Sequence, residues 1–285
     1  MTASQLQHYV PRFYLEAFAG GRDRALYAYD KSNGRIFSCS PPKIAAEKSF
    51  YDLARIDEEH ADALETALSS LESEVANIFR CWHRQLAQTR FTIPPESRAI
   101  ISQYLSVQML RTPEQRKILS EFHRKTVGPI PPGDEVADLH LHLLWNSKLV
   151  QEIADHLATF VWVVTTNHSD VPYWTSDHPV LVKDRKSKHW LTGPGVFDMG
   201  VQVIFPVSPV HMLYCMEPEG WASTKRFDGS ISPVTITDYM VQHENSGQVG
   251  MSTRRVFAPD RDFSFATEFC EQNPQITDPE RERFQ

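Results

Sequence analysis

Four short segments of this 285-residue chain contain side chains that can transfer protons or bind ligands. In the first, from Gln7 to Phe18, polar and aromatic residues are dense and include His8 and Arg12. His8 could serve as an acid, a base or a metal ligand, because the unperturbed pKa of histidine lies near neutrality. The alternative is structural, since a hydrogen bond between His8 and the backbone would fix the start of the fold.

The second and third segments pair acidic groups with a cation. Glu65 and Glu72 are seven residues apart in a predicted helix, so they share a face that also includes Leu68. Gln108 and Arg111 are three residues apart in the next predicted helix, and Arg111 can bind a carboxylate or a phosphate with two parallel hydrogen bonds. A salt bridge that fixes helix packing and a functional site are equally compatible with this set.

The fourth segment, from Trp174 to Val180, resembles a strand end or a turn between two strands. Its Ser176 and Asp177 are ordinary turn-forming residues, and the Asp177 carboxylate could accept backbone N–H groups. A carboxylate at a strand end is also a common position for a catalytic group or a metal ligand. The sequence therefore leaves a structural and a catalytic role open.

If these segments converge, we expect a hydrolase that acts on a phosphate-bearing substrate, such as a nucleic acid or a nucleotide. His8 would be the general acid or base. Glu72 and Asp177 would orient water or hold a divalent cation such as Mg²⁺ or Mn²⁺, while Arg111 would bind the phosphate. The catalytic candidates are His8, Glu72 and Asp177, and the substrate-binding candidates are Arg12, Gln108, Arg111 and Ser176.

The alternative function belongs to another class: a non-catalytic ligand-binding or regulatory protein whose polar cluster is structural. An open cleft around the cluster would favour catalysis, whereas a sealed and fully paired cluster would favour the structural interpretation. The sequence leaves the substrate and the oligomeric state open.

The first half of the chain contains the elements that must position these residues. Two short β-rich runs flank the turn Lys31–Gly34, which predicts a hairpin over residues 25–39. Apolar residues at three- and four-residue steps predict a helix over 58–88 and a second one from Pro94 onward. Thr112 and Pro113 should end that helix and start another, with a bend near Arg111. After the proline-rich linker 128–133, we expect one further helix over 134–156.

The second half changes to β-rich runs at 160–165, 201–205 and 211–215, followed by a helix over 237–251 with Thr237 as its N-cap and a strand at 255–258. We therefore expect an α+β fold with an N-terminal hairpin, long central antiparallel helices and a mostly antiparallel C-terminal sheet. The expected organisation is a single domain over 1–273, with a helical layer at about 57–156 and a flexible tail over 274–285.

Composition excludes several classes of protein. A formal net charge of −7 argues against a surface that binds a phosphate backbone throughout its length. The four cysteines show no CxxC spacing, and the sequence lacks the GxSxG, GxxxxGK[ST], HExxH and GxGxxG motifs. Neither a membrane-spanning apolar run nor an export signal is recognisable, so we expect a cytoplasmic protein.

Taken together, these motifs resemble the domain of unknown function 4238 family nearly from end to end. The resemblance rests on the opening His8–Phe18, on glutamates like Glu65 and Glu72, on Gln-x-x-Arg-x-Pro at 108–113, on Thr-Ser-Asp-x-Pro-Val at 175–180, on Pro-x-Ser-Pro at 206–209 and on a late asparagine placed at Asn245. The resemblance implies which residues group together, but it implies no activity.

Overall fold

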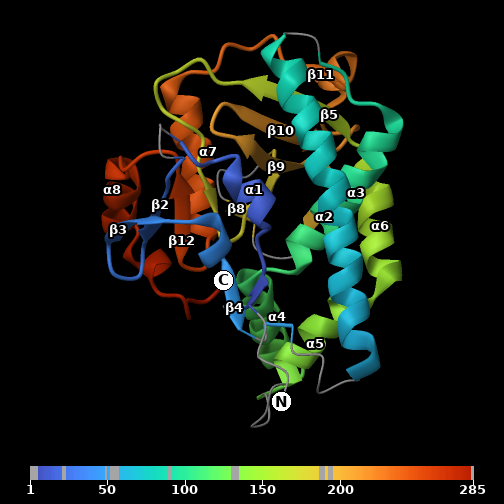
Figure 1. Ribbon diagram of the computed structural model, residues 1–285, viewed down its shortest axis with the longest axis vertical. Coiled ribbons are helices and arrows are strands. Elements are labelled where there is room, and N and C mark those ends of the chain that lie inside the picture. The colour runs from blue at the N-terminus through green and yellow to red at the C-terminus, as the bar shows by residue number, and fades with distance from the viewer. Residues whose placement is uncertain are drawn as a thin grey trace.

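The computed structural model describes residues 6–20, 24–48, 50–51, 58–88, 91–129, 135–185, 190–191 and 195–283. They form the expected α+β fold, in which a layer of helices packs beside two larger sheets (Figure 1). Within this part of the chain, no helix combines the length and the apolar character needed to cross a bilayer.

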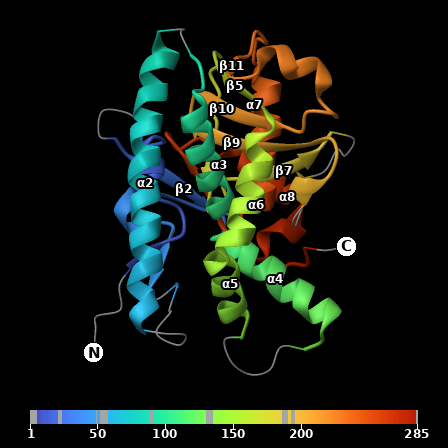
Figure 2. The ribbon, with the colours of Figure 1, turned by 90° about the vertical axis from the view of Figure 1, so that its right-hand side faces the viewer.

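Five helices make up the helical layer. They are α2 (Glu58–Ala87), α3 (Pro95–Leu110), α4 (Pro113–Thr126), α5 (Glu135–Trp145) and α6 (Ser147–Ala158). Helices α2, α3 and α6 run side by side, and α4 and α5 lie toward one end of them (Figure 2). The predicted break at Arg111 is confirmed: α3 ends at Leu110, and the Thr112 hydroxyl caps α4 by accepting the Gln115 N–H at 3.3 Å.

The prediction of one helix over 134–156 is wrong. Asn146 divides this segment into α5 and α6, because its side-chain oxygen accepts the Leu149 N–H at 3.1 Å. A side chain that satisfies an N–H group of the first turn favours a new helix start at that position. The apolar periodicity continues across the break, so it did not reveal the boundary.

The larger sheet has the strand order β11-β5-β10-β9-β7-β8. Its members are β5 (Val161–Thr166), β7 (Leu181–Asp184), β8 (Trp190–Leu191), β9 (Val201–Ser208), β10 (His211–Met216) and β11 (Ser230–Ile231). All the pairs are antiparallel except β11 with β5. The three predicted β-rich runs at 160–165, 201–205 and 211–215 thus become the adjacent strands β5, β9 and β10.

The second sheet pairs strands from the N-terminal part of the chain with strands from its C-terminal half. Its order is β3-β2-β12-β6, with β2 (Leu26–Asp30), β3 (Arg35–Cys39), β12 (Arg255–Ala258) and β6 (Thr175–Ser176), and all its pairs are antiparallel. A third, two-stranded sheet pairs β1 (Leu6–His8) with β4 (Ala46–Lys48). The helices outside the layer are α1 (Arg12–Glu16), α7 (Asp238–Met251) and α8 (Ser264–Gln272).

The predicted hairpin is β2 and β3, although its turn differs in detail from the expectation. Gly34 has a φ of +69°, but Asn33 is outside the left-handed region. Its side-chain oxygen instead accepts the Arg35 N–H at 3.0 Å, and its N–H donates to the Asp30 carbonyl at 3.2 Å. A single glycine therefore supplies the positive φ that closes the turn.

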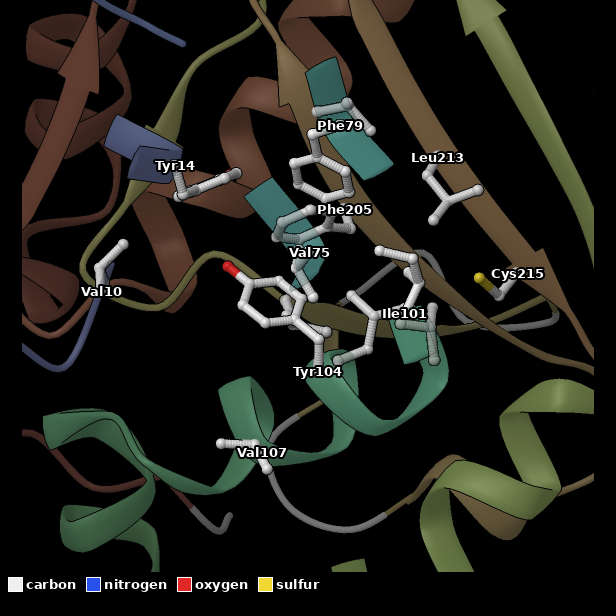
Figure 3. Packing of buried hydrophobic residues seen from close by; sticks show 14 of the residues in the cluster. Val10, Tyr14, Val75, Phe79, Ile101, Tyr104, Val107, Phe205, Leu213 and Cys215 are labelled. Carbon is white, nitrogen blue, oxygen red and sulfur yellow. The ribbon is translucent and has the colours of Figure 1, made fainter. Parts of the chain in front are cut away.

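Aromatic packing ties α1, α2 and α3 to the larger sheet. The ring of Tyr14 in α1 stacks on Phe205 of β9 at 4.9 Å, and Phe79 of α2 and Tyr104 of α3 lie 6.1 and 6.0 Å from the same ring (Figure 3). The Tyr14 hydroxyl donates to the Pro206 carbonyl at 2.7 Å, so this buried polar atom is paired. The opening segment is thereby fixed against the helices that flank it.

The C-terminal segment differs from the expected flexible tail over 274–285, because residues 274–283 are anchored. Arg283 is buried, and its guanidinium donates to both oxygens of Glu114 at 3.0 Å. Arg281 donates to the same carboxylate at 2.9 Å, and so does the Thr253 hydroxyl. Glu114 is completely buried in the first turn of α4, where the helix dipole also favours a negative charge.

Replacing Arg283 with alanine should destabilise the fold by about 3 kcal/mol, because Glu114 would lose half of its arginine partners while it remains buried. Urea unfolding measures this change in free energy. The matched control is Arg12→Ala, which removes an exposed i,i+4 pair with Glu16 and should cost about 0.5 kcal/mol or less. If Arg283→Ala costs as little free energy of unfolding as the control, the ion pair of the C-terminal segment does not contribute to stability.

Candidate functional site

A buried arginine connects three elements at the N-terminal half of α2. The Arg111 Nη1 atom donates to the Glu72 carboxylate on α2 at 2.7 Å, and its Nε atom donates to the Gln108 amide oxygen at 2.7 Å. The amide nitrogen of Gln108 donates in turn to the Tyr9 carbonyl at 2.9 Å, directly after β1. This chain of hydrogen bonds places His8, the last residue of β1, beside the α2 face that contains Glu72.

The end of α3 holds Arg111 in place through its own carbonyl groups. The Tyr51 hydroxyl donates to the Arg111 carbonyl at 3.0 Å, and the His140 Nε2 atom donates to the Leu110 carbonyl at 2.6 Å. His140 can donate at Nε2 as a neutral ring, and burial lowers its pKa to about 4. Two of the carbonyl groups that the end of α3 leaves without a partner in the helix are therefore satisfied.

The electrostatics of Arg111 keep it charged. Burial is the largest single influence and lowers its pKa, but the Glu72 carboxylate together with the Tyr51 and Tyr104 hydroxyl groups raises it more, so the net direction is upward. Its side chain is 1% exposed, whereas that of Glu72 keeps 27% of its surface. Solvent and ligands can thus reach the Glu72 carboxylate, while the buried guanidinium of Arg111 fixes its position through a hydrogen bond.

These residues line an open pocket of about 160 Å³. Its walls include His8, Tyr51, Glu65, Glu72 and Arg111, together with Leu64 and Leu68 of α2. Among the described residues, the buried Nε2 atom of His8 has no hydrogen-bond partner, whereas the Arg111 guanidinium also interacts with the Tyr104 hydroxyl. Buried polar atoms of a native protein are normally paired, so the His8 nitrogen marks the pocket as a candidate ligand site.

Three predicted site residues lie outside this pocket. Arg12 is exposed on α1 and pairs with Glu16 at 2.7 Å. Ser176 is buried, and its hydroxyl donates to the Gln248 side-chain oxygen at 2.7 Å. Gln108 is also fully buried, and both ends of its amide are bonded, so its role is to position Arg111. None of these three side chains therefore lines the pocket or faces a ligand bound in it.

Asp177 is the fourth residue that does not line the pocket. Its two oxygens accept the backbone N–H groups of Thr253, Arg254 and Arg255, each at 2.8 Å. Burial raises its pKa, and the N–H groups of this segment together with the Lys31 ammonium act in the opposite direction. The carboxylate therefore fixes the start of β12 against the end of β6, which is the structural alternative that the sequence left open.

Lys31, in the hairpin turn, is buried near Asp177, and we call the buried charged group that the two form with Glu114, Arg281 and Arg283 the sealed cluster. Its ammonium donates to the Val249 carbonyl at 2.8 Å and to the Ser252 carbonyl at 2.6 Å, at the C-terminal end of α7. A cation at this position satisfies carbonyl groups that have no partner within the helix. No local sequence pattern indicates this role, because a lysine in a hairpin turn is normally solvated.

Glu244 of α7 is a further buried carboxyl group that the sequence did not single out. Burial raises its pKa to about 7, which outweighs the opposing effects of Lys183 and of the Tyr214 hydroxyl. A perturbed carboxyl group can indicate a functional site. Glu244 lines none of the described pockets, so we treat it as a titrating group of the core.

Replacing Asp177 with asparagine should destabilise the protein by about 2 to 4 kcal/mol, since hydrogen bonds to a charged group contribute roughly 1.5 to 3 kcal/mol each and the new NH₂ group would face a donor. Thermal and urea unfolding measure the loss. Asp170→Asn, on an exposed aspartate, should change stability by less than about 0.5 kcal/mol. A variant at Asp177 that kept its stability but lost ligand turnover would restore the catalytic role that the sequence suggested.

The Glu244→Gln variant should gain stability relative to the wild type as the pH rises. The folded protein binds a proton at Glu244 up to about pH 7, whereas the unfolded chain releases it near pH 4.5. The stabilisation from this bound proton is complete below pH 4.5 and is lost as the pH rises through 7. Denaturant unfolding between pH 4.5 and 8 should show a difference that grows by up to about 3 kcal/mol. Glu152→Gln, at an exposed site, should show no such slope.

Comparisons with known proteins give one match. Residues 6–262 match the family described as "Protein of unknown function (DUF4238)". No curated protein and no solved structure matches the chain. The matched range includes β1, α2, the break at Arg111 and the Asp177 turn, so it covers both the open pocket and most of the sealed cluster. Because the match extends over most of the chain, the protein belongs to the DUF4238 family of proteins of unknown function.

Proposed function

We propose that this protein hydrolyses a phosphate ester whose phosphate group enters the pocket between β1 and α2. The observation that supports this function is the juxtaposition of an unpartnered buried imidazole nitrogen, on His8, with a carboxylate that Arg111 holds in place. Proton transfer and orientation of the attacking water are two of the tasks that side chains perform in phosphate-ester hydrolysis. A nucleotide and a nucleic acid are the substrates that the sequence suggested, and both remain candidates for the assay.

Each residue has a distinct role in this proposal. His8 donates a proton to the leaving oxygen or takes one from the attacking water through Nε2. Glu72 orients that water, and its position is fixed by the 2.7 Å hydrogen bond from Arg111. Arg111 and Gln108 act as positioning residues, because Arg111 holds the Glu72 carboxylate and Gln108 bonds both Arg111 and the Tyr9 carbonyl. Asp177 and Ser176 stabilise the fold.

The charge of the pocket favours a phosphate that enters with a divalent cation. Glu65 and Glu72 provide two carboxylates against the single guanidinium of Arg111, so a bare phosphate would meet net negative charge. Mg²⁺ is commonly held by one or two carboxylates together with substrate phosphates and water. Among the described residues no set of three such ligands converges, so Glu72 would hold Mg²⁺ or Mn²⁺ jointly with the substrate. The ion would neutralise charge on the phosphate oxygens.

A second function, ligand binding without turnover, is favoured by a different observation. Glu72, Arg111, Gln108 and Tyr9 form a continuous hydrogen-bonded chain that fixes three elements, as a purely structural network would. In that case the pocket would recognise an anionic ligand, and the polar chain would only maintain its shape. Binding of phosphate without measurable hydrolysis would support this alternative.

The His8→Gln variant should hydrolyse phosphate esters about 10²- to 10⁴-fold more slowly than the wild type, the range expected for loss of a general acid or base. The assay measures release of phosphate from aryl phosphates, ATP and a DNA oligonucleotide, with Mg²⁺, with Mn²⁺ and with EDTA. The melting temperature of each variant is measured in parallel, so that unfolding is not mistaken for loss of catalysis.

The control for this assay is His142→Gln, because His142 is exposed and lies outside the pocket. It should retain full activity. Unchanged hydrolysis by a folded His8→Gln variant would overturn the proposal, and so would hydrolysis by the wild type that is insensitive to EDTA and unaffected by Glu72→Gln.

A further inference from the structure

The polar pocket is too small to enclose a whole organic phosphate. Its volume of about 160 Å³ is below the roughly 300 to 1,000 Å³ of sites that enclose small molecules. The pocket therefore holds the phosphate and little else, and the rest of the substrate must lie outside it. A neighbouring surface must therefore bind the organic part of the substrate.

A second hollow of about 650 Å³ lies on the other flank of α2, between α2, α3 and the junction of α5 with α6. These helices run beside one another in Figure 2. Its floor is aliphatic and buried or half-buried, and it consists of Leu64, Leu68, Leu71, Val107, Leu144 and Val150. The polar residues are exposed at its rim, as Gln103 and Gln151 illustrate. An apolar floor with a polar rim suits an aliphatic group.

The polar pocket and this apolar groove share two wall residues, Leu64 and Leu68. Both are on α2, one turn apart, and Leu68 is only partly buried. Leu64 and Leu68 thus separate the two hollows, and a ligand that occupies both has to cross this leucine pair. Glu74 is the one charged residue among those known to line the groove, so no described lysine or arginine there could pair with a second phosphate.

We propose that the substrate is an amphipathic phosphate ester: its phosphate binds in the polar pocket, and its alkyl chain lies in the apolar groove. This inference rests on the proposed function, because it assigns the organic part of the same substrate. It disfavours a nucleic acid, whose next phosphate would have to occupy a surface without cations. A single alkyl chain matches both the aliphatic floor and the absence of paired charges.

The test is the affinity of a homologous series of n-alkyl phosphates, from ethyl to octyl, measured by calorimetry with Mg²⁺ at concentrations below micelle formation. Each methylene group that enters the groove should tighten binding about two- to fourfold, the upper value corresponding to complete burial. Inorganic phosphate and AMP serve as probes without an alkyl chain and should bind more weakly than octyl phosphate.

A matched pair of variants on α2 locates the chain. Ala67 is exposed and lines the groove, whereas Ala87 is exposed at the end of the same helix and lines no described pocket. Ala67→Trp should fill the groove and abolish most of the chain-length dependence, while inorganic phosphate binds as in the wild type. Ala87→Trp should leave both properties unchanged.

The outcomes separate this inference from the proposed function. If the wild type binds inorganic phosphate but octyl phosphate binds no more than twofold tighter than ethyl phosphate, the alkyl-chain inference fails and the phosphate site survives. AMP that binds more tightly than octyl phosphate would likewise replace the alkyl chain with a nucleoside. If phosphate itself does not bind in the presence of Mg²⁺, the proposed function fails, and this inference fails with it.

Discussion

The arrangement of the open pocket depends on the burial of one guanidinium group. An unpaired charge in the interior would cost far more free energy than the fold can offset, so Arg111 requires partners from neighbouring elements. It finds Glu72 on α2 and Gln108 on its own helix, and Gln108 extends the connection to Tyr9. The need to pair this cation thus fixes α2, α3 and β1 relative to one another, and His8 is positioned as a consequence.

The break between α3 and α4 makes this arrangement accessible. Thr112 and Pro113 end one helix and begin the next, which leaves Arg111 at a helix terminus. A terminal arginine can turn toward α2 while its carbonyl accepts a bond from Tyr51. The same break places Glu114 in the first turn of α4, where it binds the two arginines of the C-terminal segment. One local feature of the sequence therefore contributes to both the open pocket and the sealed cluster.

Local patterns predicted the elements better than they predicted the partners. Apolar periodicity indicated α2, the N-cap Thr237 indicated α7, and turn chemistry indicated the β2–β3 hairpin and the break at Arg111. Three of the expected site residues, His8, Glu72 and Arg111, do line one pocket. Asp177 has the residue type and the strand-end position of a catalytic group, but three backbone N–H groups take up its oxygens. Those donors are more than 70 residues away in the chain, and no local rule specifies them.

The contrast between Glu72 and Asp177 shows what the sequence could not reveal about the site. Both are carboxylates beside buried cations, yet one keeps a face toward a pocket and the other is enclosed by backbone donors. The difference arises from which segments the tertiary fold brings together. For the same reason the anchoring of Arg283 against Glu114 was missed: a polar C-terminal segment reads as a frayed tail unless its distant buried partner is known.

The central claim is that a phosphate group binds against His8. Nitrogen-15 NMR of the histidine side chains tests it most directly, with the His8 signals assigned by their absence from the His8→Gln variant. Titration with inorganic phosphate and Mg²⁺ should shift the His8 Nε2 resonance in a saturable way and leave the buried His140 and His178 unchanged. No shift at His8, or a shift confined to other histidines, would contradict the account.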